Sequence, residues 1–204
     1  MLFRSRGISE EFPLEGARSL YGATKLCSEL LLAEYLDMYG LKGVVNRCGV
    51  VAGPWQMGKT DQGVLALWVA RHLFRGSLQY IGYGGSGKQV RDMLHVDDLV
   101  RLIVHEIRNL DALSGQTFNV GGELERAVSL QELTLLCQEA TGNRIEIGGV
   151  AEERPADIRL YVTDSGRIKA ATGWSQTKSV RDIVEDTYHW MQERRDTLQA
   201  IFGA

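Results

Sequence analysis

The stretch Tyr21-Gly22-Ala23-Thr24-Lys25 opens a long apolar segment that runs to about Gly40. Side chains four residues apart lie on one face of a helix, so the ammonium of Lys25 can act on the phenol of Tyr21. A nearby positive charge favours the phenolate and lowers the pKa of tyrosine from its usual value near 10. The pair therefore predicts a general acid/base for the hydroxyl group of an alcohol or a sugar. A chance pairing on one helix is the open alternative.

The composition excludes several classes of protein. The 204 residues are 44% apolar and 24% charged with a net charge of −3, which predicts a soluble globular protein. The basic residues are scattered, so we expect no nucleic-acid partner. No apolar run reaches the roughly 18 residues that span a bilayer, so we expect no membrane partner. Cys27, Cys48 and Cys137 lie far apart in apolar runs, which predicts buried free thiols in a reducing cytoplasm.

The segments around this helix indicate an α/β protein. Leu26 to Leu36 is apolar on all sides, so one face must pack on a sheet and another on something else. Gly43–Cys48 is short and β-branched, as in a buried parallel strand. Because ligands bind beyond the carboxyl ends of parallel strands, the Gly49–Pro54 turn is a candidate site. Trp55 and its neighbours offer a flat surface for a base or a sugar, or simply core packing.

Other segments have simpler readings. Residues 82–87 satisfy Gly-x-Gly-x-x-Gly, but the next residues alternate like a strand, so we interpret them as a hairpin turn and not as a dinucleotide fingerprint. His95-Val96-Asp97-Asp98 could be mistaken for metal ligands; we expect no metal, and we expect an aspartate to cap the helix that follows. Asp61 is expected to cap a helix from Val64. Strands are expected at 78–81, 116–122 and 145–147, and helices at 64–74, 99–109, 129–141, 164–172 and 179–198.

The Tyr-x-x-x-Lys pair, Asp61-Gln62-Gly63 and Gly87-Lys-Gln-Val-Arg-Asp-Met-Leu-His95 together resemble the extended short-chain dehydrogenase/reductase family, in its NAD-dependent sugar-nucleotide epimerases and dehydratases. The resemblance extends from about Ile8 to Trp190. It implies the C-terminal part of a doubly wound, Rossmann-like parallel sheet with an interleaved smaller substrate-binding cap. Residues 1–53 and 94–122 would form an incomplete NAD-binding part, and residues 54–93 and 123–204 the cap.

The resemblance also implies roles for single residues. Tyr21 and Lys25 would be the catalytic pair and would contact NAD, as would Val50. Where the family usually has Asn-Val-Tyr-Gly-Pro, this chain has Val50-Val-Ala-Gly-Pro54, so the contacts of that asparagine and tyrosine cannot be carried over and a simple 4-epimerase is disfavoured. The expected contacts to the nucleotide-sugar substrate come from four further residues: Gln62, Arg91, Arg154 and Asp157.

Arg91 is the substrate contact with the clearest chemical reason. A planar guanidinium can bond two phosphate oxygens at once, which suits the pyrophosphate of a sugar nucleotide. The alternative is an ion pair with Asp92 or another neighbour.

The resemblance favours NAD-dependent epimerisation at C2 of a CDP-deoxyhexose through a transient keto sugar. The alternatives are a dehydratase, a 4-epimerase, or a non-catalytic fragment that binds a sugar nucleotide or a partner. The helix of Tyr21 and Lys25 would carry a homo-oligomer interface or lie in a thick core. The glycine-rich strand, turn and helix that hold NAD would lie before Ile8, so we expect the isolated chain to be inactive.

Overall fold

The computed structural model describes residues 7–15, 19–58, 63–153 and 157–202. Asp61, Gln62 and Arg154 lie outside these ranges, so the roles expected for them are not addressed by the structure.

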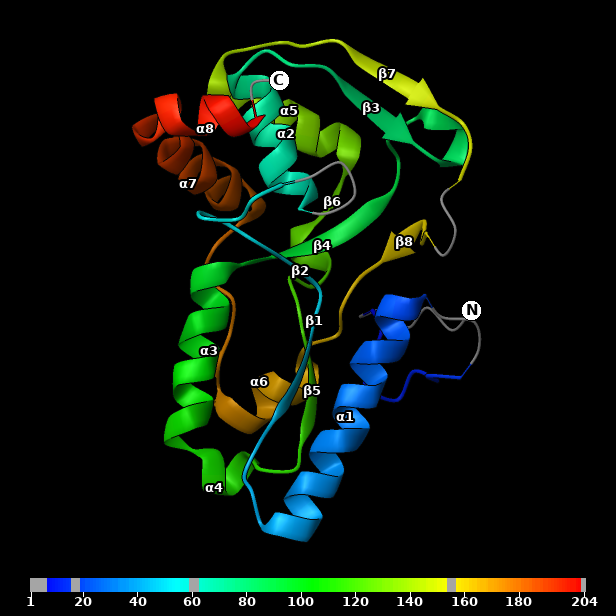
Figure 1. Ribbon diagram of the computed structural model, residues 1–204, viewed down its shortest axis with the longest axis vertical. Coiled ribbons are helices and arrows are strands. Elements are labelled where there is room, and N and C mark those ends of the chain that lie inside the picture. The colour runs from blue at the N-terminus through cyan, green and yellow to red at the C-terminus, as the bar shows by residue number, and fades with distance from the viewer. Residues whose placement is uncertain (1–6, 16–18, 59–62, 154–156, 203–204) are drawn as a thin grey trace.

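Helix α1 (Leu20–Tyr39) and strand β1 (Val45–Cys48) form the first layer and the start of the sheet. The side chain of Ser19 accepts a hydrogen bond from the backbone of Gly22 and caps α1, which ends at Gly40 in the left-handed conformation. Strand β1 runs parallel to β5 (Thr117–Val120). Figure 1 shows α1 on one side of these two strands and α3 (Val96–Arg108) on the other, as in a doubly wound sheet.

Strand β4 (Val90–His95) is the centre of a second sheet. It pairs in parallel with β2 (Val50–Ala52) and β8 (Leu160–Tyr161), and antiparallel with β6 (Ala127–Ser129). A third sheet consists of β3 (Leu78–Ile81) and β7 (Ile147–Val150) in parallel. The fold is therefore α/β with mainly parallel pairing, as expected.

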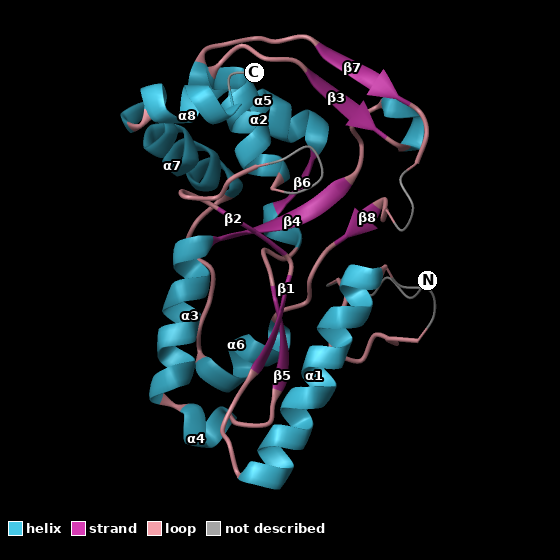
Figure 2. Ribbon diagram, in the orientation of Figure 1, coloured by secondary structure: helices cyan, strands magenta, loops and turns pink. Residues whose placement is uncertain are grey.

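Four helices gather at one end of the molecule (Figure 2): α2 (Val64–Leu73), α5 (Leu130–Thr141), α7 (Val180–Glu193) and α8 (Arg195–Phe202). The remaining short elements are α4 (Leu110–Leu113), α6 (Gly166–Thr172), η1 (Tyr83–Gly85) and η2 (Leu124–Arg126). Capping boxes begin α5 at Ser129 and α7 at Ser179, because each serine exchanges hydrogen bonds with an acidic residue three positions later.

The buried side chains form two apolar clusters that meet at β4. One cluster lies among α2, α5 and α7 and contains Met93. The other lies among β5, α3 and α6 and contains Leu94. Because consecutive side chains of a strand point to opposite faces, β4 contributes to both clusters.

Two faces of the described chain have no apolar cover. No residue of α1 is buried, although the helix carries many leucines. Helix α3 exposes an apolar stripe at the spacing i, i+3, i+4, i+7: Val100, Ile103, Val104 and Ile107. Among the described residues, β1 pairs only with β5, which leaves its second edge unpaired.

Several expectations about local structure were wrong. Strand β4 does follow residues 82–87, but β3 and β4 belong to different sheets, so the segment is not a hairpin turn. Helix α3 is capped by His95, whose Nδ1 accepts a hydrogen bond from the backbone of Asp97, and not by an aspartate. Gly63 is the N-cap of α2, and Asp61, from which a cap was expected, lies outside the described residues. The last expected helix is divided at Arg194 into α7 and α8.

The cysteines also differ from expectation. Cys137 is fully buried, and burial raises the pKa of its thiol well above the usual range. Cys27 and Cys48 are free but exposed, because the faces of α1 and β1 that carry them have no covering element.

Candidate active site

Tyr21 and Lys25 lie one turn apart on the exposed first half of α1. The Nζ of Lys25 is 5.2 Å from the centroid of the Tyr21 ring, and 68% of Tyr21 is exposed. The ammonium therefore lies over the ring face, where the aromatic quadrupole attracts it. No hydrogen bond or ion pair occupies either polar group within the described residues. Both groups are open to a ligand from solvent.

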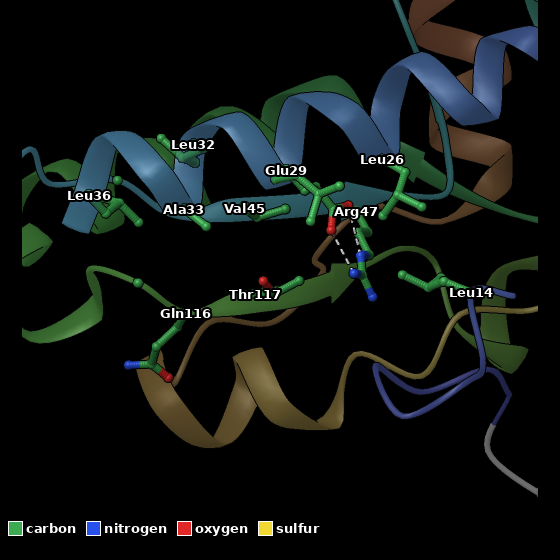
Figure 3. Close-up of a pocket in the computed structure, with 13 residues that line it drawn as sticks. Leu14, Leu26, Glu29, Leu32, Ala33, Leu36, Val45, Arg47, Gln116 and Thr117 are labelled. Carbon is green, nitrogen blue, oxygen red and sulfur yellow. Dashed lines mark hydrogen bonds and ion pairs between the residues drawn. The ribbon is translucent and has the colours of Figure 1, made fainter. Parts of the chain in front are cut away.

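A bidentate ion pair holds α1 against β1. The guanidinium of Arg47 donates two hydrogen bonds to the carboxylate of Glu29, of 2.9 and 2.6 Å (Figure 3). These bonds raise the pKa of Arg47 despite the opposing effect of burial. Glu29 lies about two helical turns beyond Tyr21, so the pair fixes the rotation of α1 over the sheet and thereby the direction of Tyr21.

Beneath α1 the packing is incomplete. A pocket of about 330 Å³ separates the helix from β1 and β5, and Arg47 and Glu29 form part of its wall. Its apolar lining comes mostly from one face of α1, including Leu26, Leu32 and Leu36. The ion pair therefore contributes more to the placement of α1 than it would beside a close-packed helix.

The carboxyl ends of β1 and β5 meet Asp92 of β4 in a tightly packed polar junction. A Cβ added at Gly121 would collide with Thr163 and with Asp92, so only glycine fits there. Burial raises the pKa of Asp92, although hydrogen bonds from Thr163 and from the backbone of Glu123 act in the opposite direction. This junction fixes the two sheets relative to each other.

Val50 begins β2 directly after this junction. Gly49 is the single residue between β1 and β2, so here the chain leaves one sheet and joins the next. Val50 is partly buried and pairs with Met93 of β4. It therefore lies at the carboxyl edge of β1, where parallel sheets bind ligands.

Arg91 and Asp157 form an ion pair between β4 and the segment that enters β8. Nη2 of Arg91 donates to Oδ1 of Asp157 at 3.0 Å, and Nη1 donates to the backbone oxygen of Val90 at 2.8 Å. Both side chains are about one quarter exposed. The expected alternative was an ion pair with Asp92 or another neighbour; Arg91 does form an ion pair, but with Asp157, because Asp92 points to the opposite, buried face of β4. A guanidinium has five N–H groups, and the three that these two bonds do not use have no partner in the described part of the chain.

Trp55 lies apart from this ion pair. It follows the carboxyl end of β2, whereas Arg91 lies near the amino end of β4, which runs parallel to β2. Its exposed ring contacts Arg194, whose guanidinium carbon is 4.6 Å from the ring centroid. The described contacts of Trp55 are thus with α7 and Arg194 and not with the candidate substrate residues.

The structure describes five of the seven residues expected at the site: Tyr21, Lys25, Val50, Arg91 and Asp157. It joins Tyr21 to Lys25 and Arg91 to Asp157, and it shows no contact between the two pairs among the described residues. Sequence analysis missed Glu29 and Arg47. Their pairing has no local signal, because 18 residues separate them.

Comparison with known proteins points to one family. The model of the "NAD dependent epimerase/dehydratase family" matches residues 4–121. CDP-paratose 2-epimerase of Salmonella typhi is 30% identical over 84% of this chain and 51% of its own length. A dTDP-glucose 4,6-dehydratase of Salmonella typhimurium is 28% identical over 84% of this chain and 47% of its length. The chain therefore spans about half the length of these curated relatives.

A solved structure agrees with the sequence matches. The Thermus thermophilus UDP-glucose 4-epimerase in complex with NAD superposes with a TM-score of 0.74 and 25% identity, over 92% of this chain and 61% of that one.

Proposed function

The chain belongs to the NAD dependent epimerase/dehydratase family, and on that premise we propose that it carries the acid/base pair and the substrate-binding residues of an enzyme that acts on a nucleotide-activated sugar. The observation that carries the proposal is the pair of Tyr21 and Lys25, one turn apart on the open face of α1. The exposed phenol is free to meet a substrate hydroxyl, and the ammonium of Lys25 lies over its ring, 5.2 Å from the centroid.

The proton chemistry follows from this pair. Tyr21, as phenolate, takes the proton of a sugar hydroxyl and holds it at its Oη, while Lys25 balances the charge. When bound, NAD would supply the redox chemistry, as acceptor and then donor of the hydride of the carbon that bears this hydroxyl. Tyr21 would return its proton to the same oxygen, and reduction of the keto sugar from the other face would invert the carbon.

The described residues fit one end of NAD. Lys25 has an open ammonium that suits a ribose hydroxyl, and Val50 lies at the edge of the sheet where the cofactor would approach. The pyrophosphate needs a glycine-rich turn at a helix start, whereas Gly82–Gly87 leads into β4. We therefore propose that residues 1–204 alone bind NAD weakly and turn over no substrate.

On the substrate side, we propose that Arg91 bonds the diphosphate and that Asp157 orients it. Gln62 and Arg154 complete the proposed contacts. The stretch Gly87–His95 and the 30% identity to CDP-paratose 2-epimerase support epimerisation at C2 of a CDP-deoxyhexose. The second candidate is dehydration of a nucleotide sugar, which the 28% identity to a dTDP-glucose 4,6-dehydratase supports.

The larger organisation is also proposed. We propose a division into an NAD-binding part, residues 1–53 and 94–122, and a cap, residues 54–93 and 123–204. The two apolar clusters follow these bounds only in part, because Ile168 and Trp174 of the cap pack with Leu94, and Ala52 packs in the other cluster. The uncovered leucines of α1 support a homo-oligomer through this helix. Free Cys27, Cys48 and Cys137 support a reducing cytoplasm. No described helix is long and apolar enough to cross a membrane.

An assay of the gene's full reading frame tests the function. The purified protein is incubated with NAD and separately with CDP-, dTDP- and UDP-hexoses, and the products are analysed by NMR. Inversion at C2 supports the epimerase, and loss of water supports the dehydratase. Absence of any change in all three sugar nucleotides, in a folded protein that binds NAD, contradicts the proposal.

A further inference from the structure

Tyr83 has a backbone conformation that is unusual for a bulky residue. Its φ is 51°, in the left-handed region, and it begins the short helix η1 between β3 and β4. Such a conformation is strained for a tyrosine and persists only where its surroundings hold it. Four glycines with positive φ accompany it: Gly82, Gly84, Gly85 and Gly87. The other left-handed positions of this turn are glycines, so the tyrosine at position 83 is the exception that needs a reason.

The side chain of Tyr83 reaches the segment that holds the candidate substrate residues. Its hydroxyl donates a hydrogen bond of 3.0 Å to the backbone oxygen of Asp157, 74 residues away. Burial and the carboxylates of Asp157 and Glu153 raise the pKa of Tyr83, so its hydroxyl stays protonated and remains a donor at neutral pH. The hydrogen bond therefore persists over the physiological pH range.

Several hydrogen bonds hold the carboxylate of Asp157 in place, and that carboxylate in turn holds the guanidinium of Arg91. Its Oδ1 accepts hydrogen bonds from the backbone of Ile158 at 2.8 Å and from Arg91 at 3.0 Å. The contacts connect Tyr83 to Asp157 and Asp157 to Arg91.

The turn that bears Tyr83 is itself braced. Nε2 of Gln89, a buried residue, donates to the backbone oxygen of Ile81 at 2.5 Å, across the turn. The hydroxyl of Ser86 donates to the backbone oxygen of Tyr83 at 3.3 Å. These two hydrogen bonds therefore hold the turn that carries Tyr83 in one conformation.

We propose that Tyr83 is a positioning residue: its hydroxyl anchors Asp157, and Asp157 orients the guanidinium of Arg91 toward the diphosphate of a nucleotide. This role rests on the proposed function, because Arg91 is the group that meets the ligand. Under this proposal the Gly-x-Gly-x-x-Gly stretch at residues 82–87 contributes to substrate binding and does not bind a dinucleotide.

Calorimetric titration with CDP tests the proposal. Tyr83→Phe removes only the hydroxyl, so we expect about three- to tenfold weaker binding of CDP by the chain. The matched control is Tyr80→Phe in β3, whose hydroxyl bonds Thr134 at 2.7 Å and does not touch Asp157. We expect Tyr80→Phe to lower the melting temperature and to leave CDP affinity unchanged.

A double-mutant cycle separates positioning from general stability. If Tyr83 acts through Arg91, then Tyr83→Phe has no further effect on CDP affinity in a chain that already carries Arg91→Ala. Equal losses in both backgrounds overturn the proposal.

NMR of the ligand-free chain gives a second readout. We expect separate Nη signals of Arg91 in the parent chain, because its ion pair slows rotation of the guanidinium, and averaged signals in Tyr83→Phe. Unchanged Arg91 signals overturn the positioning role. Failure of the parent chain to bind CDP contradicts the proposed function instead. In that case the NMR comparison still tests whether the hydroxyl of Tyr83 holds Asp157 and Arg91 in place.

Discussion

The guanidinium of Arg47 in β1 donates two hydrogen bonds, of 2.9 and 2.6 Å, to the carboxylate of Glu29 in α1, and both side chains are about three quarters buried. No residue of α1 is buried, so this ion pair is a principal attachment of the helix to the sheet. The helix also bears Tyr21. The position of the candidate acid/base therefore depends on a contact about two turns away.

We expect Arg47→Ala to lower the free energy of unfolding by about 1–2 kcal/mol, because it leaves Glu29 partly buried without its partner. Amide hydrogen exchange should accelerate in α1 more than in α2. Arg181→Ala is the control, since Arg181 pairs with Glu139 on the exposed surface and should change stability much less than Arg47→Ala does. Equal effects of both substitutions would show that the Arg47 pair has no special role.

Tyr21→Phe should reduce turnover of the full-length protein about a hundredfold or more, because the phenyl ring cannot transfer the proton. Affinity for the sugar nucleotide should stay nearly constant. Tyr35→Phe, on the same exposed helix, is the matched control and should keep its rate. A rate within a few-fold of the parent in Tyr21→Phe would rule out this assignment.

Arg91→Ala should act on binding rather than on the chemical step. The loss of a two-point phosphate contact should weaken CDP affinity by about 1.5–3 kcal/mol in calorimetry. Arg91→Lys should recover only part of that loss, because an ammonium lacks the planar fork. Unchanged affinity in Arg91→Ala would leave Arg91 as a structural partner of Asp157.

Asp98 should make stability depend on pH in the acid range. Burial alone would raise its pKa, but hydrogen bonds from Arg101, Thr177 and the backbone of Lys178 outweigh burial and lower the pKa. A carboxylate whose pKa is lowered by folding stabilises the protein above its unfolded pKa of about 3.9, and this contribution is lost as the pH falls through the folded pKa.

Asp98→Asn should therefore cost on the order of 3 kcal/mol at pH 7 and less near pH 3, which lies below the unfolded pKa of about 3.9, where this contribution has begun to fall. Urea unfolding at both pH values measures the difference. The neighbouring Asp97 has a side chain that is 70% exposed, so Asp97→Asn serves as the control. A cost of Asp98→Asn that does not change with pH would show that its charge is not the stabilising feature.

The isolated chain should self-associate, because α1, the α3 stripe and the free edge of β1 expose apolar and unpaired groups. Light scattering should show a mass above that of one chain, and Ile107→Lys should lower it. Leu135→Lys, on an exposed position of α5, should have less effect. A monodisperse monomer at high concentration would contradict this expectation.

Local signals in the sequence predicted much of the fold. The apolar run after Tyr21 and the glycine near its end predicted α1, and α5 and α7 begin where helices were expected from residues 129 and 179, because each of these features depends on residues close in the chain. The strand pairing of β3 with β7 could not be predicted, since it joins segments almost 70 residues apart with no pattern that specifies the partner.

The candidate site likewise contains residues that local spacing predicts and residues that only the strand pairing brings together. Tyr21 and Lys25 were recognisable because helical spacing alone brings them together. The partner of Arg91 was not, because Asp157 reaches it only through the pairing of β8 with β4. His95 was missed as a cap because Asp97 and Asp98 are the more common capping residues.

Strand β4 places Met93 in one apolar cluster and Leu94 in the other. Insertion or deletion of a single residue in this strand would exchange the two side chains and present each cluster with the wrong one. The same change would turn Arg91 inward and Asp92 toward solvent. In evolution, β4 can therefore accept substitutions by side chains of similar size but not insertions or deletions. The loops around it can accept insertions.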